Sequence, residues 1–157
     1  MIDFYAQIES GLLAILQDAP GLTGVRVWET EVREVLFTGE ALSKGFRGEE
    51  LPAVMITAAL DPSRSSPFTT GQIQYKIPAQ VLIVTRAQKG RDARAEALGL
   101  ARAAEAAIHG ARRSDELLGP NTFVTGEVVS SFVVVEQKPL CFAVASIAVE
   151  VTKVVEL

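Results

Sequence analysis

The chain has 157 residues, which indicates a single domain over residues 1–157 with a substantial core. Its formal charge of −4 argues against a nucleic-acid-binding module, which usually carries a basic face, and its single cysteine excludes an internal disulfide. Hydrophobic residues make up 48% of the chain and the mean hydropathy is +0.26, a surplus that favours surface buried between subunits.

Neither a membrane span nor a signal peptide is expected. The longest apolar runs, residues 51–60 and 140–149, are far shorter than the roughly 20 residues that a spanning helix needs. The first residues, Met1-Ile2-Asp3-Phe4, lack the basic region that opens a signal peptide.

The first predicted element is a helix over residues 3–18. Its apolar side chains recur at helical spacing, at Phe4, Ile8, Leu12 and Ile15. The run Ala19-Pro20-Gly21 ends it, because proline and glycine both disfavour further helix.

Four strands are predicted next. They cover residues 25–28, 32–37, 51–60 and 72–85. Residues 38–50 and residues 61–71 are predicted to form mobile loops, and the second of these is rich in proline, serine and threonine. Residues 81–84 are apolar on both faces, which is typical of a central strand covered on each side.

The last third of the chain predicts a second helix and a hairpin. The helix covers residues 91–109 and has a buried stripe made mostly of alanine, which favours close packing on a sheet. Strands over residues 122–136 and 140–154 are joined by a three-residue turn and should therefore pair antiparallel. The fold class that follows is α+β, a mostly antiparallel sheet packed by two helices in the order α-β-β-β-β-α-β-β.

The final strand predicts how its two faces are covered. Its odd positions stay apolar from Cys141 to Val151, whereas its even positions become mostly polar after Val144. One face should therefore lie in the core throughout. The other face should be buried only in its first half, by a neighbouring element or by another subunit.

Side chains suited to catalysis are few. His109 ends the second helix, where the helix dipole favours a cation, and Cys141 occupies an inward strand position as a small hydrophobe. No zinc-spaced ligand set, nucleophile motif or dinucleotide fingerprint occurs in the sequence. We therefore predict no catalytic, cofactor-binding or metal-binding residues.

Four residues are candidate contacts with another subunit or a partner. Phe46 is a large apolar residue in a polar loop, which suits an anchor in a partner protein, and Arg47 follows it. Arg112 and Arg113 lie in the polar connection over residues 110–120. The simpler interpretation of both segments is an ordinary solvent-exposed loop.

The element order, together with three local features, resembles a known family. Leu51-Pro52-Ala53-Val54 opens a strand, a long strand over residues 75–85 runs into an alanine-rich helix, and the final hairpin contains Val149-Glu150-Val151. This arrangement resembles the tail terminator proteins (also called tail completion or minor tail proteins) of long-tailed bacteriophages, the lambda-type group and its Mu-like relatives. The resemblance covers nearly the whole chain as an element order.

The resemblance implies a structural virion protein rather than an enzyme. Such proteins form a hexameric ring on the end of the tail tube, stop its polymerisation and present a surface to the head–tail connector or neck protein. The implied partners are copies of the chain itself, the tail tube protein and the neck, with no cofactor and no membrane. The implied location is the virion tail, after assembly in the host cytoplasm.

A ring of this chain would be acidic. Six subunits at −4 each would carry about −24 charges. An acidic lumen would repel DNA phosphates, so that DNA passes through without sequence-specific binding.

Two other classes of function stay open from the sequence. The first is a small homo-oligomeric enzyme or ligand-binding domain whose site lies between subunits, with Tyr5, Tyr75 or His109 supplying polar groups. A concave pocket with convergent polar groups would favour this class. The second is a regulatory adaptor that binds a host protein, for which the sequence carries no signature.

Overall fold

The computed structural model describes residues 4–22, 26–29, 52–58, 64–87, 92–110, 118–119, 121–137 and 140–157. Two helices and a mostly antiparallel sheet follow one another in the predicted order, which confirms the α+β class. The elements are α1 (Phe4–Gln17), β1 (Arg26–Glu29), β2 (Ala53–Ala58), β3 (Arg64–Thr69), β4 (Gln72–Arg86), α3 (Ala93–Gly110), β5 (Thr122–Gln137) and β6 (Leu140–Glu156).

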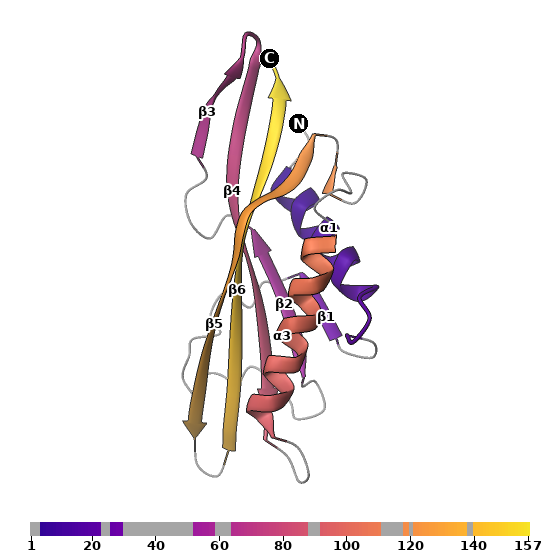
Figure 1. The fold of residues 1–157 in the computed structure, drawn as a ribbon, viewed down its shortest axis with the longest axis vertical. Helices are drawn as coiled ribbons and strands as arrows, with labels where there is room; N and C mark the ends of the chain where they lie inside the picture. Colours follow the sequence, from indigo (N-terminus) through magenta and orange to yellow (C-terminus); the bar gives the residue numbers. More distant parts are fainter. Residues whose placement is uncertain are drawn as a thin grey trace.

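The six strands form one sheet in the order β1-β2-β4-β6-β5, with β3 paired to β4 outside this path. Only β1 and β2 pair in parallel; the other described pairs are antiparallel. The β4–β6 pair runs without interruption from Gln72↔Glu156 to Arg86↔Phe142 and forms the centre of the sheet. Figure 1 shows the β3–β4 hairpin extending beyond the helices at one end of an elongated molecule.

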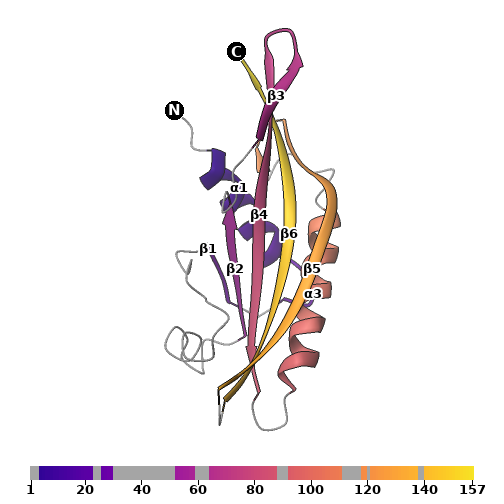
Figure 2. The ribbon, with the colours of Figure 1, turned by 90° about the vertical axis from the view of Figure 1, so that its left-hand side faces the viewer.

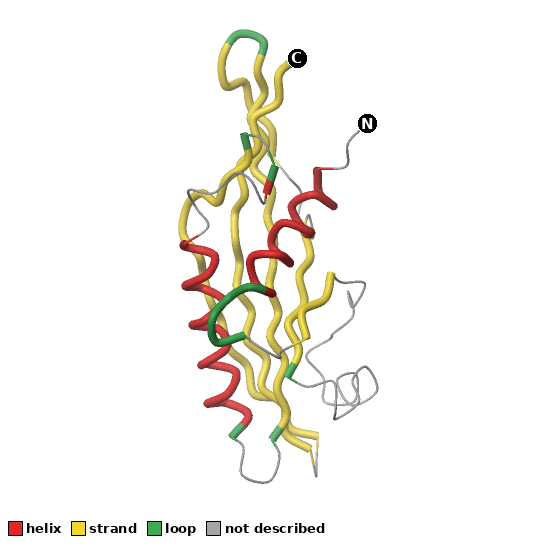
Figure 3. The backbone as a smooth tube through the Cα atoms, turned by 90° about the vertical axis from the view of Figure 1, so that its right-hand side faces the viewer, coloured by secondary structure: helices red, strands yellow, loops and turns green. Residues whose placement is uncertain are grey.

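Both helices cover the same face of the sheet (Figures 1 and 3). The main core lies between them and the sheet, because the apolar stripe of each helix meets alternate residues of the strands. Its members include Ile8 and Leu12 of α1, Ala104 and Ile108 of α3, and Val54, Ile83 and Ile147 of the strands. Each large aliphatic side chain buried here contributes roughly 1.5–3 kcal/mol.

Helix α3 lies close to the sheet because small residues form its inner stripe. Ala93, Ala97 and Ala104 are buried, and Ala93 and Ala97 pack with Ala143 of β6. The hydroxyl of Thr85 on β4 donates a 2.6 Å hydrogen bond to the Ala93 carbonyl. At the first turn, the Asp92 carboxylate accepts a hydrogen bond from the Arg94 amide at 3.0 Å, in the manner of an N-cap.

The opposite face of the sheet, here called the helix-free face, is buried over only part of its length. Met55, Val84, Phe142 and Val144 are at most 1% exposed, although they point away from the two helices. Beyond them the Gln80 amide donates a 2.6 Å hydrogen bond to Ser146, and β6 then becomes exposed at Ala148 and Glu150. The predicted loss of burial after the first half of this face is confirmed at Ala148 and Glu150. It does not hold at Thr152, which is only 2% exposed.

The prediction that residues 61–71 form a loop is wrong for residues 64–69, which form strand β3. The polar composition suggested a loop, yet every described residue of β3 is exposed, so a polar strand is stable there. Pro67 is tolerated because an edge strand does not need every amide proton. Gly71 closes the hairpin with a φ of +81°.

The described strands before α3 are therefore β1, β2, β3 and β4, and β3, which was not predicted, pairs with β4. The strand predicted at residues 32–37 lies outside the described residues, as do the loop at 38–50 and most of the connection at 110–120. No helix of the described part of the chain is long and apolar enough to span a membrane.

Gly119 provides a test of this packing, because its φ is +106° and α1 lies beside it. Gly119→Ala should lower the free energy of unfolding by about 1–2 kcal/mol, the typical cost of a left-handed conformation for a residue with a Cβ. The nearby Gln7 amide, 2.8 Å from an added Cβ, is flexible, so the cost arises mainly in the backbone. Urea denaturation measures the change.

The matched control is Gly99→Ala on the exposed side of α3, where an added Cβ meets nothing within 4 Å. Here the same substitution should raise the free energy of unfolding by about 0.5–1 kcal/mol, because alanine loses less entropy than glycine in a helix. Equal effects at the two positions would contradict the described backbone at Gly119.

Candidate contact surface

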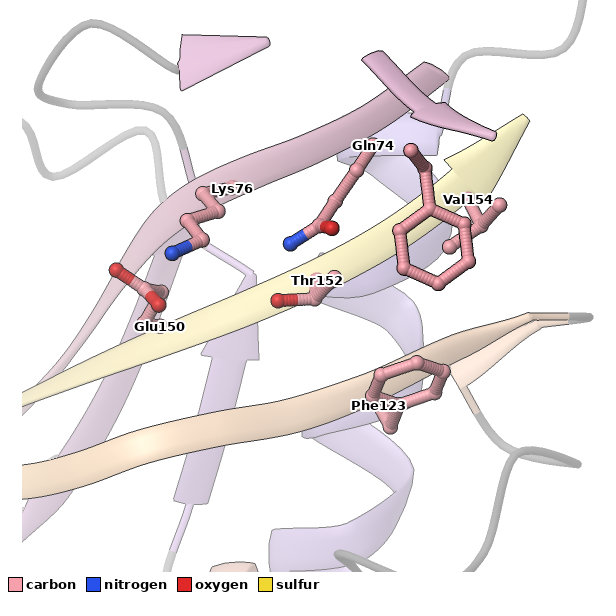
Figure 4. Close-up of a pocket in the computed structure, with 7 residues that line it drawn as sticks. Gln74, Lys76, Phe123, Glu150, Thr152 and Val154 are labelled. Atoms are coloured by element: carbon pink, nitrogen blue, oxygen red, sulfur yellow. The ribbon is translucent and has the colours of Figure 1, made fainter. Parts of the chain in front are cut away.

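A groove of about 400 Å³ opens on the helix-free face, near the end that carries the β3–β4 hairpin. Four strands contribute to it (Figure 4). Its lining residues are Phe68 of β3, Gln74 and Lys76 of β4, Phe123 of β5, and Glu150, Thr152 and Val154 of β6. We refer to this feature as the distal groove.

Strand register brings these residues together from distant parts of the sequence. Lys76 pairs with Thr152, and Thr152 pairs with Phe123, so the three lie in a row across β4, β6 and β5. Their sequence neighbours Ile77 and Val151 point into the main core, so strand alternation directs the groove residues to the helix-free face. The strand pairing therefore determines which side chains lie next to one another in the distal groove.

The distal groove combines exposed aromatic walls with a polar floor. Phe68 is 54% exposed and Phe123 is 37% exposed, whereas Thr152 is only 2% exposed and forms part of the floor. Lys76 and Glu150 are both exposed, and Figure 4 shows their charged ends pointing toward one another. Exposed aromatic side chains beside a few polar groups are typical of protein–protein contact sites.

The titratable groups that line the groove are Lys76 and Glu150. No cysteine or histidine is among its lining residues, and no group of three or more metal-ligating side chains occurs in the described ranges. The groove is suited to binding through shape, apolar contact and a few charges.

The four predicted contact residues cannot be placed relative to the groove. Phe46, Arg47, Arg112 and Arg113 all lie outside the described residues, so their role stays a prediction.

The residues considered for an intersubunit active site lie away from the distal groove. Tyr5 and Tyr75 are partly buried against the main core on the helix-covered face. His109 is exposed at the end of α3.

Cys141 was predicted to be a buried hydrophobe, but it is less buried than this prediction stated. The cysteine is free and only partly buried. The first turn of α3 packs against Ala143, two residues further along β6, so the helix covers the following positions better than it covers Cys141.

Sequence reasoning missed both aromatic walls of the groove. Phe68 is a large apolar residue in a polar segment. Phe46 was chosen as a candidate contact for this reason, and the same reasoning would have identified Phe68. Phe123 opens an apolar strand and carries no such signal. Its exposure depends on the cross-strand register, which a single strand's sequence does not specify.

Comparisons with protein-family models and with curated proteins find no match for this chain.

Proposed function

We propose that this chain is a non-enzymatic structural virion protein that caps the tail tube of a long-tailed bacteriophage. In this proposal six copies form a ring that ends tube polymerisation and presents the joining surface to the head–neck connector. Its partners are other copies of itself, the tail tube protein and the neck. DNA passes through the ring without sequence-specific contacts.

The observation that carries the proposal is the distal groove. It places two exposed phenylalanines, Phe68 and Phe123, on a rigid sheet face at the end from which the β3–β4 hairpin extends (Figure 2). Aromatic anchors on a preformed surface reduce the entropy lost on docking. A tube cap requires such a surface at one end of each subunit.

Two further properties agree with a ring around DNA. The α+β fold with its element order is the one that the resemblance to tail terminators implies. The negative charge of −4 per subunit would give the ring an acidic character that disfavours tight binding of DNA phosphates. A ring needs head-to-tail contacts between two different surfaces of each subunit.

The alternative function is a small homo-oligomeric enzyme or ligand-binding domain. The volume of the distal groove, about 400 Å³, lies within the range of small-molecule pockets. Gln74, Lys76, Glu150 and Thr152 would supply polar contacts. A saturable small ligand whose binding is abolished by Thr152→Val, with no effect on tail tubes, would favour this alternative.

The test of the proposed function is a tube-length assay. Purified chain is added to the polymerising tail tube protein of the phage that encodes it, and tube lengths are measured by electron microscopy. We expect added protein to stop growth, so that tubes become shorter as its concentration rises. An unchanged length distribution at saturating protein would contradict the proposal.

A further inference from the structure

Strand β5 is an edge of the sheet that the described strands form. Among these strands it pairs only with β6, and it forms the end of the strand order (Figure 2). Pairing with β6 is regular from Val129↔Ala148 to Gln137↔Leu140. Every second residue of this stretch therefore directs its backbone amide and carbonyl away from the sheet.

Residues 129–134 of this edge lack the charged residues and proline that usually protect an exposed strand, and the irregularity of β5 between Thr125 and Val129 lies before this stretch. Charged residues and proline commonly block unwanted pairing, and β3 has both in Arg64 and Pro67. Residues 129–134 of β5 read Val-Ser-Ser-Phe-Val-Val and contain neither. Within this stretch Val129 is 56% exposed, Val133 is 42% exposed and Val134 is 46% exposed.

We propose that this edge is a self-association surface, on which β5 of a second copy pairs antiparallel about a two-fold axis at Ser131. In this register Ser131 lies opposite Ser131 of the second copy. Val129 of each copy lies opposite Val133 of the other on the helix-free face. The inference is independent of the proposed function, because a two-fold contact is distinct from the head-to-tail contacts of a ring.

Charge complementarity between Glu105 and Arg94 favours a second copy of the chain as the partner of this edge. On the helix-covered face, Glu105 of α3 accepts a hydrogen bond from the Ser130 hydroxyl, and the Arg94 guanidinium lies 5.9 Å from the centre of the Phe132 ring. The proposed register sets Ser130 opposite Phe132 of the second copy. The Glu105 carboxylate of the first copy therefore lies beside Arg94 of the second copy. By symmetry, Arg94 of the first copy lies beside Glu105 of the second copy.

The two copies of α3 have room beside one another. Helix α3 packs mainly over β6 and β4 rather than over the edge strand. Joining two β5 strands separates the two β6 strands by three strand spacings, about 14 Å. Packed helices need about 8–10 Å between their axes, so the helices do not collide.

Oxidative cross-linking tests the pairing directly. In a Cys141→Ala background, Ser131→Cys places one new thiol on the proposed axis, where opposed antiparallel residues have Cα atoms about 4.5–5.5 Å apart. This separation matches the range of a disulfide. We expect the band at 16.8 kDa to shift to twice that mass on a non-reducing gel and to return on reduction.

The control is Ser66→Cys in the same background, which places an exposed thiol on the opposite, protected edge strand. It should stay monomeric under the same oxidant. Absence of the covalent dimer at position 131, or an equal yield at position 66, would overturn the proposal.

The register has its own test. Glu105→Arg should lower the cross-linking yield of Ser131→Cys, because it sets two cations side by side across the axis. Adding Arg94→Glu to that variant should restore the yield. A yield that the single reversal leaves unchanged would contradict the proposed register, and circular dichroism verifies that each variant is folded.

Discussion

Phe142→Ala should destabilise the protein more than most single substitutions, lowering the free energy of unfolding by about 3–5 kcal/mol. Phe142 is 1% exposed and is among the largest fully buried side chains of the described residues. It lies on the helix-free face of β6 and pairs with Arg86 of β4. Truncation leaves a cavity in a rigid sheet that cannot collapse around it.

Urea denaturation followed by circular dichroism measures this effect. The matched control is Phe68→Ala, the same chemical change at a side chain that is 54% exposed. Surface substitutions of this kind usually change stability by within about 0.5 kcal/mol. Equal destabilisation by the two variants would contradict the burial of the first half of the helix-free face.

Phe68→Asp and Phe123→Asp should each abolish most of the proposed tube-capping activity while leaving the fold intact. Each replaces an exposed aromatic wall of the distal groove with a charge that a partner would have to desolvate. Loss of an aromatic anchor commonly costs about 2 kcal/mol or more of binding free energy, a decrease in affinity of about 30-fold. The concentration of chain needed to halve mean tube length measures the change.

Leu98→Asp provides the matched control. Leu98 is 37% exposed, as Phe123 is, but it lies on α3, which covers the other face of the sheet. This variant should cap tubes as well as the wild type does. If all three variants lost activity equally, the groove would not be the docking surface.

The sequence predicted the class of fold well because the strongest signals are local. The helical spacing of Ile8 and Leu12 gave a helix over residues 3–18, and α1 spans Phe4–Gln17. The continuous apolar run at residues 81–84 correctly indicated a strand covered on both faces. The change from apolar to polar even positions after Val144 correctly predicted that Ala148 and Glu150 are exposed, but not that Thr152 is buried.

Strand β3 shows where local signals are insufficient. Its composition of serine, threonine and proline favours a loop, and the residues pair only because β4 extends far enough to receive them. The unpaired backbone groups of β4 stabilise a neighbour whose own propensity is weak.

The distal groove was beyond sequence reasoning for the same physical reason. Phe123 and Lys76 come together only through their shared neighbour Thr152 on β6. That register depends on the irregularity between Thr125 and Val129, which changes the alignment of β5 on β6. A pattern of alternating residues within one strand carries no information on such an offset.

In the proposed function, six copies of this chain close into a ring on a tail tube. The most direct measurement is electron microscopy of tube ends after incubation with purified chain, with class averaging of the end views. We predict an added ring of six-fold symmetry with a mass of six times 16.8 kDa, about 101 kDa, at one end only. Bare tube ends at saturating protein, or density distributed along the tube walls, would contradict the account.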